Sequence, residues 1–197
     1  GPTEGVGTLS WVVNKRRPLN PTSYVPPNLV YPAVKLRVPG NATMQVRSDV
    51  ATAIQQLFAA AQAAGHDPML SSGYRSYSYQ ASLYNSYVNR SGQAAADTYS
   101  ARPGYSEHQT GLSFDICVAG NCNLEQSFGT TPLGQWVAAH AHEYGFTIRY
   151  KQGKEAITGF TYEPWHLRYV GTDLAAQLHA SGKTLEEHFG LPAAPNY

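Results

Sequence analysis

The sequence predicts an α+β fold, a single domain in which a small, mainly antiparallel sheet is flanked by helices. Its 197 residues, 42% of them hydrophobic, suffice for one core and not for a second full domain. Some segments repeat apolar residues at helical spacing, and others alternate them as strands do. Because these segments lack a regular strand–helix alternation, a doubly wound parallel sheet is disfavoured.

The first predicted unit is an extended N-terminal segment at 1–39, ahead of a main domain at 40–197. Its stretch RRPLNPTSYVPPNLVYPAVKLRVPG is rich in proline, which favours extended chain and turns over helices. We expect this segment to pack on the main domain through its apolar side chains: Trp11, Val12, Val13, Leu29, Val30 and Leu36.

Four segments of the main domain are predicted helices. The most regular one has Ser48 as its N-cap and ends before Gly65, with apolar residues at helical spacing between them. A tyrosine-rich helix follows at about 78–88, with Ser76 or Ser78 as its cap. The remaining two helices are expected at 131–144 and 172–182.

The predicted strands are short and apolar, as expected for the interior of a small sheet. They are DPMLSSGYRS (67–76), LSFDICV (112–118), GFTIRY (145–150) and EPWHLRYV (163–170). We expect NLEQSF (123–128) to pair back onto LSFDICV as a further strand.

The charge pattern excludes several classes of partner. Only 14% of the residues are charged and the net charge is +1, with no basic cluster beyond Lys15, Arg16 and Arg17, so nucleic acid is not an expected partner. No apolar run approaches the ~20 residues that a membrane-spanning helix needs. Fourteen tyrosines and 18 glycines indicate a neutral, hydroxyl-rich surface. We expect a monomeric, extracytoplasmic protein, secreted or associated with the cell envelope, in a mature form without its export signal.

Two readings are open for the cysteines. Cys117 and Cys122 are separated by four residues, which a turn at 119–121 would bring within disulfide range. Such a bridge contributes about 2 kcal/mol and indicates an oxidising compartment. Alternatively, Cys117 faces the same side of its strand as Asp115 and joins a metal site. The disulfide is favoured, because two cysteines without a third partner make a poor structural zinc site.

The stretch GYSEHQTGLSFD contains the strongest candidates for a metal site. His108 and Asp115 lie seven residues apart around a glycine, and His166 follows later with Glu163 three residues before it. Two imidazoles and a carboxylate are a ligand set that a catalytic zinc ion accepts, and a nearby carboxylate can act as a general base. Taken alone, His108 is equally consistent with a hydrogen-bonded structural histidine. The other histidines are expected to be surface or capping residues: His66, His140, His142, His179 and His188.

Three stretches resemble the signature blocks of the VanY-type D-alanyl-D-alanine carboxypeptidases. This group belongs to the zinc D,D-/L,D-peptidases that trim bacterial peptidoglycan. The stretches are SSGYRSYSYQASLYNSYV (71–88), ARPGYSEHQTGLSFDI (101–116) and YEPWHLRYVG (162–171). They occur in the family's order, and the likeness extends from about Trp11 to about Gly171. It implies a hedgehog/D,D-peptidase-like fold with the catalytic domain at 40–197.

The resemblance also implies a metal centre and a reaction. His108, Asp115 and His166 would bind Zn²⁺, and Glu163 would be the catalytic carboxylate. The implied enzyme is a zinc metallopeptidase that uses metal-activated water to hydrolyse the terminal D-Ala-D-Ala bond of peptidoglycan stem peptides. One alternative is an L,D-carboxypeptidase or endopeptidase that acts on tetrapeptide stems or cross-bridges. A second is a non-catalytic wall-binding module on the same fold.

Three further residues match positions that would contact the substrate. Arg75 corresponds to an arginine that the family places over the scissile bond, where its charge would stabilise the developing oxyanion. Gln80 and Ser106 match positions expected to line the pocket for the substrate's C-terminal end. The sequence departs from the family at Ser113, where alanine is frequent, and this small-for-small change leaves the expected metal site intact.

Overall fold

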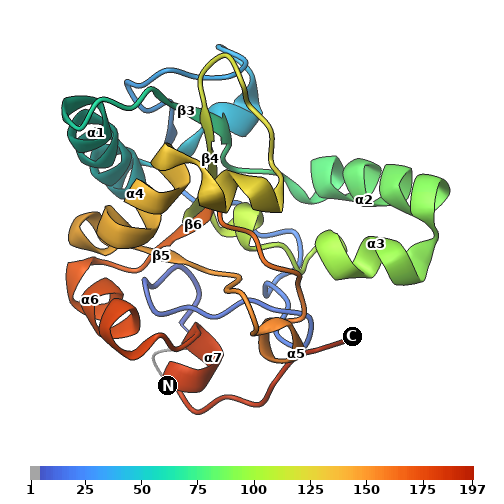
Figure 1. The fold of residues 1–197 in the computed structure, drawn as a ribbon. Helices are drawn as coiled ribbons and strands as arrows, with labels where there is room; N and C mark the ends of the chain where they lie inside the picture. Colours follow the sequence, from blue (N-terminus) through green and yellow to red (C-terminus); the bar gives the residue numbers. More distant parts are fainter. Residues whose placement is uncertain (1–4) are drawn as a thin grey trace.

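The structure, a computed structural model, describes residues 5–197 (Figure 1). Its main sheet has four strands in the order β3-β4-β6-β5, and every neighbouring pair is antiparallel. These strands are β3 (Pro68–Ser72), β4 (Ser113–Val118), β5 (Phe146–Ile148) and β6 (His166–Tyr169). A separate two-stranded sheet pairs β1 (Leu29–Val30) with β2 (Val46–Arg47). The predicted α+β fold with a small antiparallel sheet is therefore confirmed.

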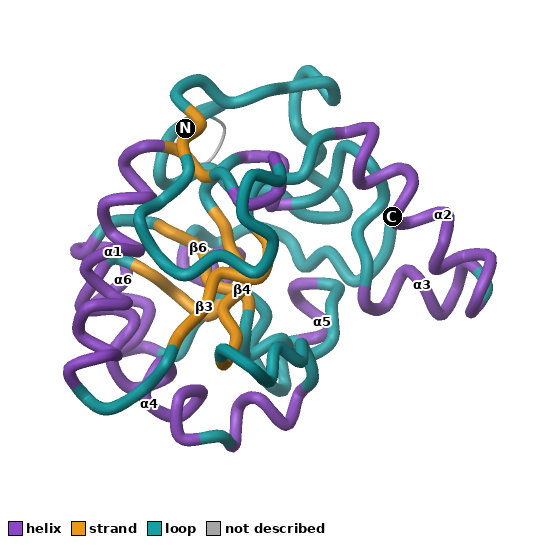
Figure 2. The backbone as a smooth tube through the Cα atoms, turned by 90° about the horizontal axis from the view of Figure 1, so that it is seen from above, coloured by secondary structure: helices purple, strands orange, loops and turns teal. Residues whose placement is uncertain are grey.

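Helices lie on two sides of this sheet. The α-helices are α1 (Ser48–Ala63), α2 (Tyr77–Ser91), α3 (Gln93–Tyr99), α4 (Pro132–His140), α5 (Glu155–Thr158), α6 (Thr172–Ser181) and α7 (Leu185–His188). The 3₁₀ helices are η2 (Ala42–Met44), η3 (Glu107–Thr110), η4 (Gln126–Thr130) and η5 (Ala141–Tyr144). Helices α1, α4 and α6 gather on one side, whereas α2 and α3 form a hairpin that projects from the opposite side (Figures 1 and 2).

The hydrophobic core is built on the central strand β4. Phe114 is fully buried there, and its ring lies 6.0 Å from that of Phe58 on α1 and 5.4 Å from that of Phe146 on β5. Asp115, the next residue of β4, faces the opposite side of the sheet because strand side chains alternate. The core thus fixes the strand that carries an expected metal ligand.

Removing the Phe114 ring should destabilise the fold strongly. Phe114→Ala is expected to lower the free energy of unfolding by about 3–5 kcal/mol, because it leaves a cavity among packed aromatic rings. Urea denaturation followed by circular dichroism measures this change. Val25→Ala is the control, because Val25 is 63% exposed and should change stability by less than about 0.5 kcal/mol. Equal effects of the two substitutions would contradict the assignment of Phe114 to the core.

Most predicted elements are found, but the helix expected at 131–144 is α-helical only to His140 and continues as the 3₁₀ helix η5. Ser76 caps α2 by accepting a hydrogen bond from the Tyr79 amide, as expected. The expected N-cap at Ser48 is wrong: Ser48 is the first residue of α1 and the helix has no side-chain cap. Its amide instead donates to the backbone oxygen of Asn28, so that the neighbouring chain satisfies the helix start.

The expected strand at 123–128 is also wrong. Part of it forms the 3₁₀ helix η4, and Phe128 from this helix is buried in the core. Beyond Val118, β4 is followed by a turn closed by an isolated bridge to Asn121. The Cys117–Cys122 disulfide spans this turn, which confirms the favoured reading and excludes Cys117 from a metal site.

The N-terminal segment packs along the main domain. Trp11 and Val13 belong to the main core, and Val12 joins a second apolar cluster with Val170 and Leu178. Leu36 packs against the core, as expected, but Val30 is 37% exposed, because the two-residue strand β1 turns it outward. The boundary at residue 39 remains a prediction, and the first four residues of the segment lie outside the described residues.

Candidate metal and catalytic centre

The three expected metal ligands come from three different elements. His108 lies in η3, Asp115 in β4, and His166 begins β6. Asp115 and His166 are directly opposite each other in the β4–β6 register, so the sheet places them side by side. The turn between His108 and Asp115 depends on Gly111, whose φ of 75° is in the left-handed region that glycine adopts without steric cost.

The three side chains converge at one point. One ligand atom from each of His108, Asp115 and His166 lies within 4.8 Å of the other two, and all three residues are buried. Nε2 of His108 is 3.3 Å from Oδ1 of Asp115, and Nδ1 of His166 is 3.5 Å from the same oxygen. The two imidazole rings are nearly perpendicular, with centroids 4.9 Å apart. This is the only cluster of three or more such groups within residues 5–197.

Hydrogen bonds on the outer side of each imidazole select the nitrogen that faces the cluster. Nδ1 of His108 is 2.8 Å from the backbone oxygen of Gly73, and Nε2 of His166 is 2.9 Å from Oε1 of Glu107. Both acceptors require an N–H, so Nε2 of His108 and Nδ1 of His166 are the nitrogens left to bind a cation. Glycine is required at position 73, because a Cβ there would collide with the backbone of Gln45.

The charge states also suit a cation. Burial lowers the pKa of His108, so its imidazole is neutral. Burial alone would raise the pKa of Asp115, but the two histidines outweigh it and lower that pKa, so the carboxylate is ionised. Oδ1 of Asp115 is buried and receives no hydrogen bond from residues 5–197. Burial alone would lower the pKa of His166, but its contacts with the carboxylates of Asp115 and Glu107 raise it to about 9, so this imidazole holds a proton that a bound cation would displace. A buried carboxylate between two imidazoles fits a divalent cation such as zinc.

Glu163 lies beside this cluster. Its carboxylate oxygen Oε1 is 3.8 Å from Nδ1 of His166, in the loop that leads into β6. Burial raises the pKa of Glu163 to about 8. A carboxyl group with a raised pKa can accept a proton and release it again near neutral pH, which general acid–base catalysis requires.

The expected site residues all line one cleft with a volume of about 320 Å³. Arg75 contributes a buried Nε that has no hydrogen-bond partner among the described residues. The residues that line the cleft beyond the seven predicted ones are Leu83, Tyr87, Tyr99, Ser100, Ala101, Glu107, Leu124, Tyr150, Phe160, Thr161 and Trp165. Several of these belong to the α2–α3 hairpin, which therefore forms one wall of the cleft.

Gln80 and Ser106 lie in the cleft wall, and the side chain of each already forms a hydrogen bond within the protein. The Gln80 Nε2 group donates to the backbone oxygen of Ala101 at 2.8 Å, whereas its buried Oε1 has no partner in the part of the chain described. Gln80 therefore keeps one unpaired acceptor within the cleft wall. Ser106 Oγ accepts a hydrogen bond from the His108 amide and so fixes the start of η3.

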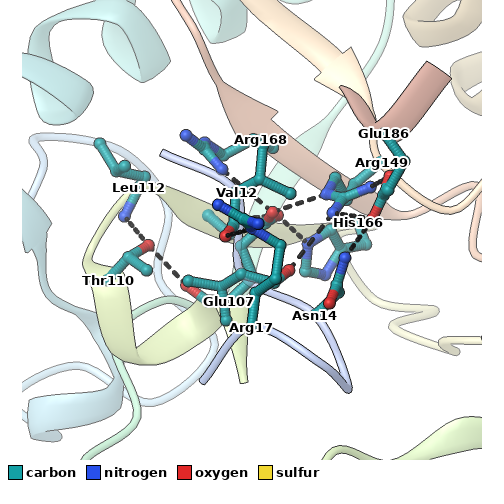
Figure 3. A network of polar contacts seen from close by, with 12 residues as sticks. Val12, Asn14, Arg17, Glu107, Thr110, Leu112, Arg149, His166, Arg168 and Glu186 are labelled. Atoms are coloured by element: carbon teal, nitrogen blue, oxygen red, sulfur yellow. Dashed lines mark hydrogen bonds and ion pairs between the residues drawn. The ribbon is translucent and has the colours of Figure 1, made fainter. Parts of the chain in front are cut away.

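Sequence reasoning missed Glu107, the residue between Ser106 and His108. It is fully buried and contacts His166, Arg149 and Arg168 (Figure 3). Burial alone would raise the pKa of Glu107, but the two arginines lower it well below its usual range, so it is an anion. One feature of the sequence could have identified Glu107: it is an acidic residue next to the expected ligand His108, in a chain with few charged residues.

Known proteins resemble this chain over most of its length. The family described as VanY, D-alanyl-D-alanine carboxypeptidase, matches residues 43–172. The putative carboxypeptidase YodJ of Bacillus subtilis is 42% identical over 180 residues, which are 90% of this chain and 66% of YodJ. VanXYC of Enterococcus gallinarum, a bifunctional D-Ala-D-Ala dipeptidase and carboxypeptidase, is 31% identical over 90% of this chain and 91% of its own. The chain spans just under two thirds of YodJ and 52% of an Enterococcus faecalis D-alanyl-D-alanine carboxypeptidase.

Solved structures show the same likeness. The L,D-carboxypeptidase LdcB superimposes with a TM-score of 0.85 at 42% identity, over 90% of this chain and 84% of its own. A variant of the vancomycin-resistance D,D-pentapeptidase VanY, solved with Zn(II), has a TM-score of 0.78 at 31% identity, over 93% of this chain and 99% of its own. Because the family match covers more than half of the sequence, the chain belongs to the VanY family of D-alanyl-D-alanine carboxypeptidases.

Proposed function

We propose that this protein is a zinc-dependent carboxypeptidase that releases the C-terminal D-alanine of peptidoglycan stem peptides. The observation that carries the proposal is the convergence of His108, Asp115 and His166 beside Glu163 in one cleft. Zinc is the metal that this ligand set favours, and a VanY relative was solved with Zn(II). The substrate class would place the reaction outside the cytoplasm. No helix within residues 5–197 has the length and apolarity needed to cross a membrane.

The side chains divide the chemistry among them. His108, Asp115 and His166 would hold the zinc ion, which when bound polarises a carbonyl group and lowers the pKa of a water molecule. Glu163 accepts a proton from the attacking water and delivers it to the amine nitrogen as the peptide bond breaks. The products are the shortened peptide and D-alanine. Proton transfer within the cleft therefore requires no other titratable group.

Arg75 stabilises the negative charge that develops on the carbonyl oxygen. An arginine guanidinium carries a delocalised positive charge, and the buried Nε of Arg75 has no partner within the described chain. A donor of this kind is already in position before the reaction, so it costs no reorganisation in the transition state.

Substitution of Arg75 tests this role. Arg75→Ala is expected to lower kcat by about 10²- to 10³-fold, the usual cost of losing an oxyanion donor. Steady-state kinetics on a stem peptide measures it, with Arg16→Ala as control, because Arg16 is exposed and, within residues 5–197, its side chain bonds only the exposed Asn196. An unchanged kcat with a raised KM would assign Arg75 to substrate binding instead.

Two peptide bonds are candidates for cleavage. The family description and the enterococcal relatives favour the D,D bond of a pentapeptide stem. A specific observation favours the L,D bond of a tetrapeptide as second candidate: LdcB has higher identity and a higher TM-score than the VanY structure. Both reactions release D-alanine and differ in the configuration of the residue before it.

A direct comparison of substrates decides between them. The zinc-loaded protein is incubated separately with pentapeptide, tetrapeptide and cross-linked dimer, and the products are identified by mass spectrometry. Loss of one alanine from the pentapeptide supports D,D cleavage, and loss from the tetrapeptide alone supports L,D cleavage. Cleavage of the dimer into monomers would indicate an endopeptidase. Peptide binding without any product would contradict the enzymatic proposal and favour a wall-binding module.

A further inference from the structure

A buried carboxylate joins the metal site to the interior of the protein. Besides the contact with His166, Glu107 accepts hydrogen bonds from Ser113 Oγ at 2.7 Å, Arg149 Nε at 2.7 Å and Arg168 at 3.1 Å (Figure 3). Ser113 and Arg168 are register partners in β4 and β6, so the sheet that carries two of the ligands also holds this carboxylate. Each of these contacts of the Glu107 carboxylate is a hydrogen bond, and all four partner residues are buried.

The network continues away from the metal site. Arg149 forms a paired interaction with Glu186, with both nitrogen–oxygen distances equal to 2.7 Å. Glu186 also accepts a hydrogen bond from Asn14 Nδ2 at 3.1 Å. Together with Glu107 and Arg168, these residues place two carboxylates against two guanidinium groups, so the buried charges balance.

The two ends of the network lie outside the stretch that matches the family. That stretch covers residues 43–172, whereas Asn14 belongs to the N-terminal segment and Glu186 to α7. The backbone oxygen of Val13 also accepts a hydrogen bond from Arg149. Segments from both ends of the described chain are thus bonded to Arg149, which in turn donates to Glu107 beside His166.

The arrangement of these buried charges is better suited to orienting the His166 ring than to stabilising the fold. A buried ion network is expensive to desolvate, and packed apolar side chains of similar volume often stabilise a protein as well or better. Two-point arginine–carboxylate pairs, however, fix position and angle closely. A carboxylate behind an imidazole sets which ring nitrogen carries the proton and how the ring is turned.

We propose that Glu107 is a positioning residue that holds His166 with Nδ1 toward the metal, and that Arg149 and Glu186 keep Glu107 in that place. The flanking segments of the chain, through Asn14 and Glu186, are therefore part of the support of the metal site. The inference rests on the proposed zinc site, but it does not depend on which peptide bond is cleaved.

Zinc affinity is the main readout. Glu107→Gln keeps the shape of the side chain and removes its charge, and it is expected to weaken zinc binding by roughly 10- to 100-fold, as measured by competition with a chromophoric chelator. In the metal-free protein, the Nε2 proton of His166 should give a downfield, slowly exchanging NMR signal because its acceptor is charged. In Glu107→Gln this signal should move upfield or be lost to exchange.

A second variant acts at a distance from the site. Glu186→Gln should weaken zinc binding by about tenfold, the lower end of the range for outer partners, although Glu186 contacts no metal ligand. Glu187→Gln is the matched control on the same helix, because Glu187 pairs with the partly exposed Lys154. The control should leave zinc affinity and the His166 signal unchanged.

The outcomes separate positioning from a purely structural role. A loss of thermal stability with unchanged zinc affinity and an unchanged His166 signal in folded Glu107→Gln would overturn the proposal. If Glu107→Gln does not fold, Glu186→Gln decides, and wild-type zinc affinity in that variant overturns the proposal. Failure of the proposed function looks different: the wild type would bind zinc and lose affinity on substitution, but would release no alanine from any stem peptide.

Discussion

Glu163→Gln is expected to bind zinc normally and to lose about 10²- to 10⁴-fold in kcat, the range typical of a general acid–base group. The amide has nearly the same shape as the carboxylate but cannot take the proton of the attacking water. Its neighbours are unaffected, because Glu163 approaches His166 only to 3.8 Å. The measurements are steady-state release of D-alanine and elemental analysis for zinc.

The control for this substitution is Glu155→Gln, which changes an exposed carboxylate at the start of α5. It should retain wild-type turnover. If Glu163→Gln turned over at the wild-type rate with zinc bound, Glu163 would be removed from the mechanism, and another group would have to carry the proton.

Asp115→Ala is expected to abolish zinc binding and, with it, hydrolysis. Both imidazoles of the cluster lie against the same Asp115 oxygen, so this substitution removes the only negative charge among the three ligands. The loss should exceed the roughly 10- to 100-fold that removal of an outer partner costs. Zinc content after dialysis and D-alanine release measure the two effects.

Asp67→Ala is the matched control, since Asp67 pairs with Lys35 at the surface and is exposed. A surface pair of this kind contributes only about 0–1 kcal/mol, and zinc binding should not change. Stoichiometric zinc in purified Asp115→Ala would contradict the assignment of the metal site.

The three expected metal ligands could be predicted mainly because their stretches resemble the signature blocks of the family, and local spacing accounts for how two of them are placed. Ser106, His108 and Gly111 belong to one turn, in which a cap, a ligand and a left-handed glycine occupy fixed positions. The alternating strand that follows places Asp115 on the face opposite to Phe114. Local spacing therefore determined where these side chains point.

The supporting network could not be predicted in this way. Glu107 and Arg149 are 42 residues apart, and Arg149 and Glu186 are 37 residues apart, so only the tertiary fold brings them together. The same reason explains the wrong N-cap at Ser48, since the backbone oxygen of Asn28 satisfies the start of α1 from another segment. Contacts that depend on distant segments leave no periodic pattern in the sequence.

The ion network also bears on how the protein can be shortened for laboratory use. A version trimmed to residues 43–172 would discard Glu186 and leave Glu107 as the one carboxylate of this network against Arg149 and Arg168, so that one buried positive charge is uncompensated. It would also remove Trp11 and Val13, which belong to the hydrophobic core. The smallest workable unit for engineering therefore reaches well past the borders suggested by similarity alone, at both ends of the chain.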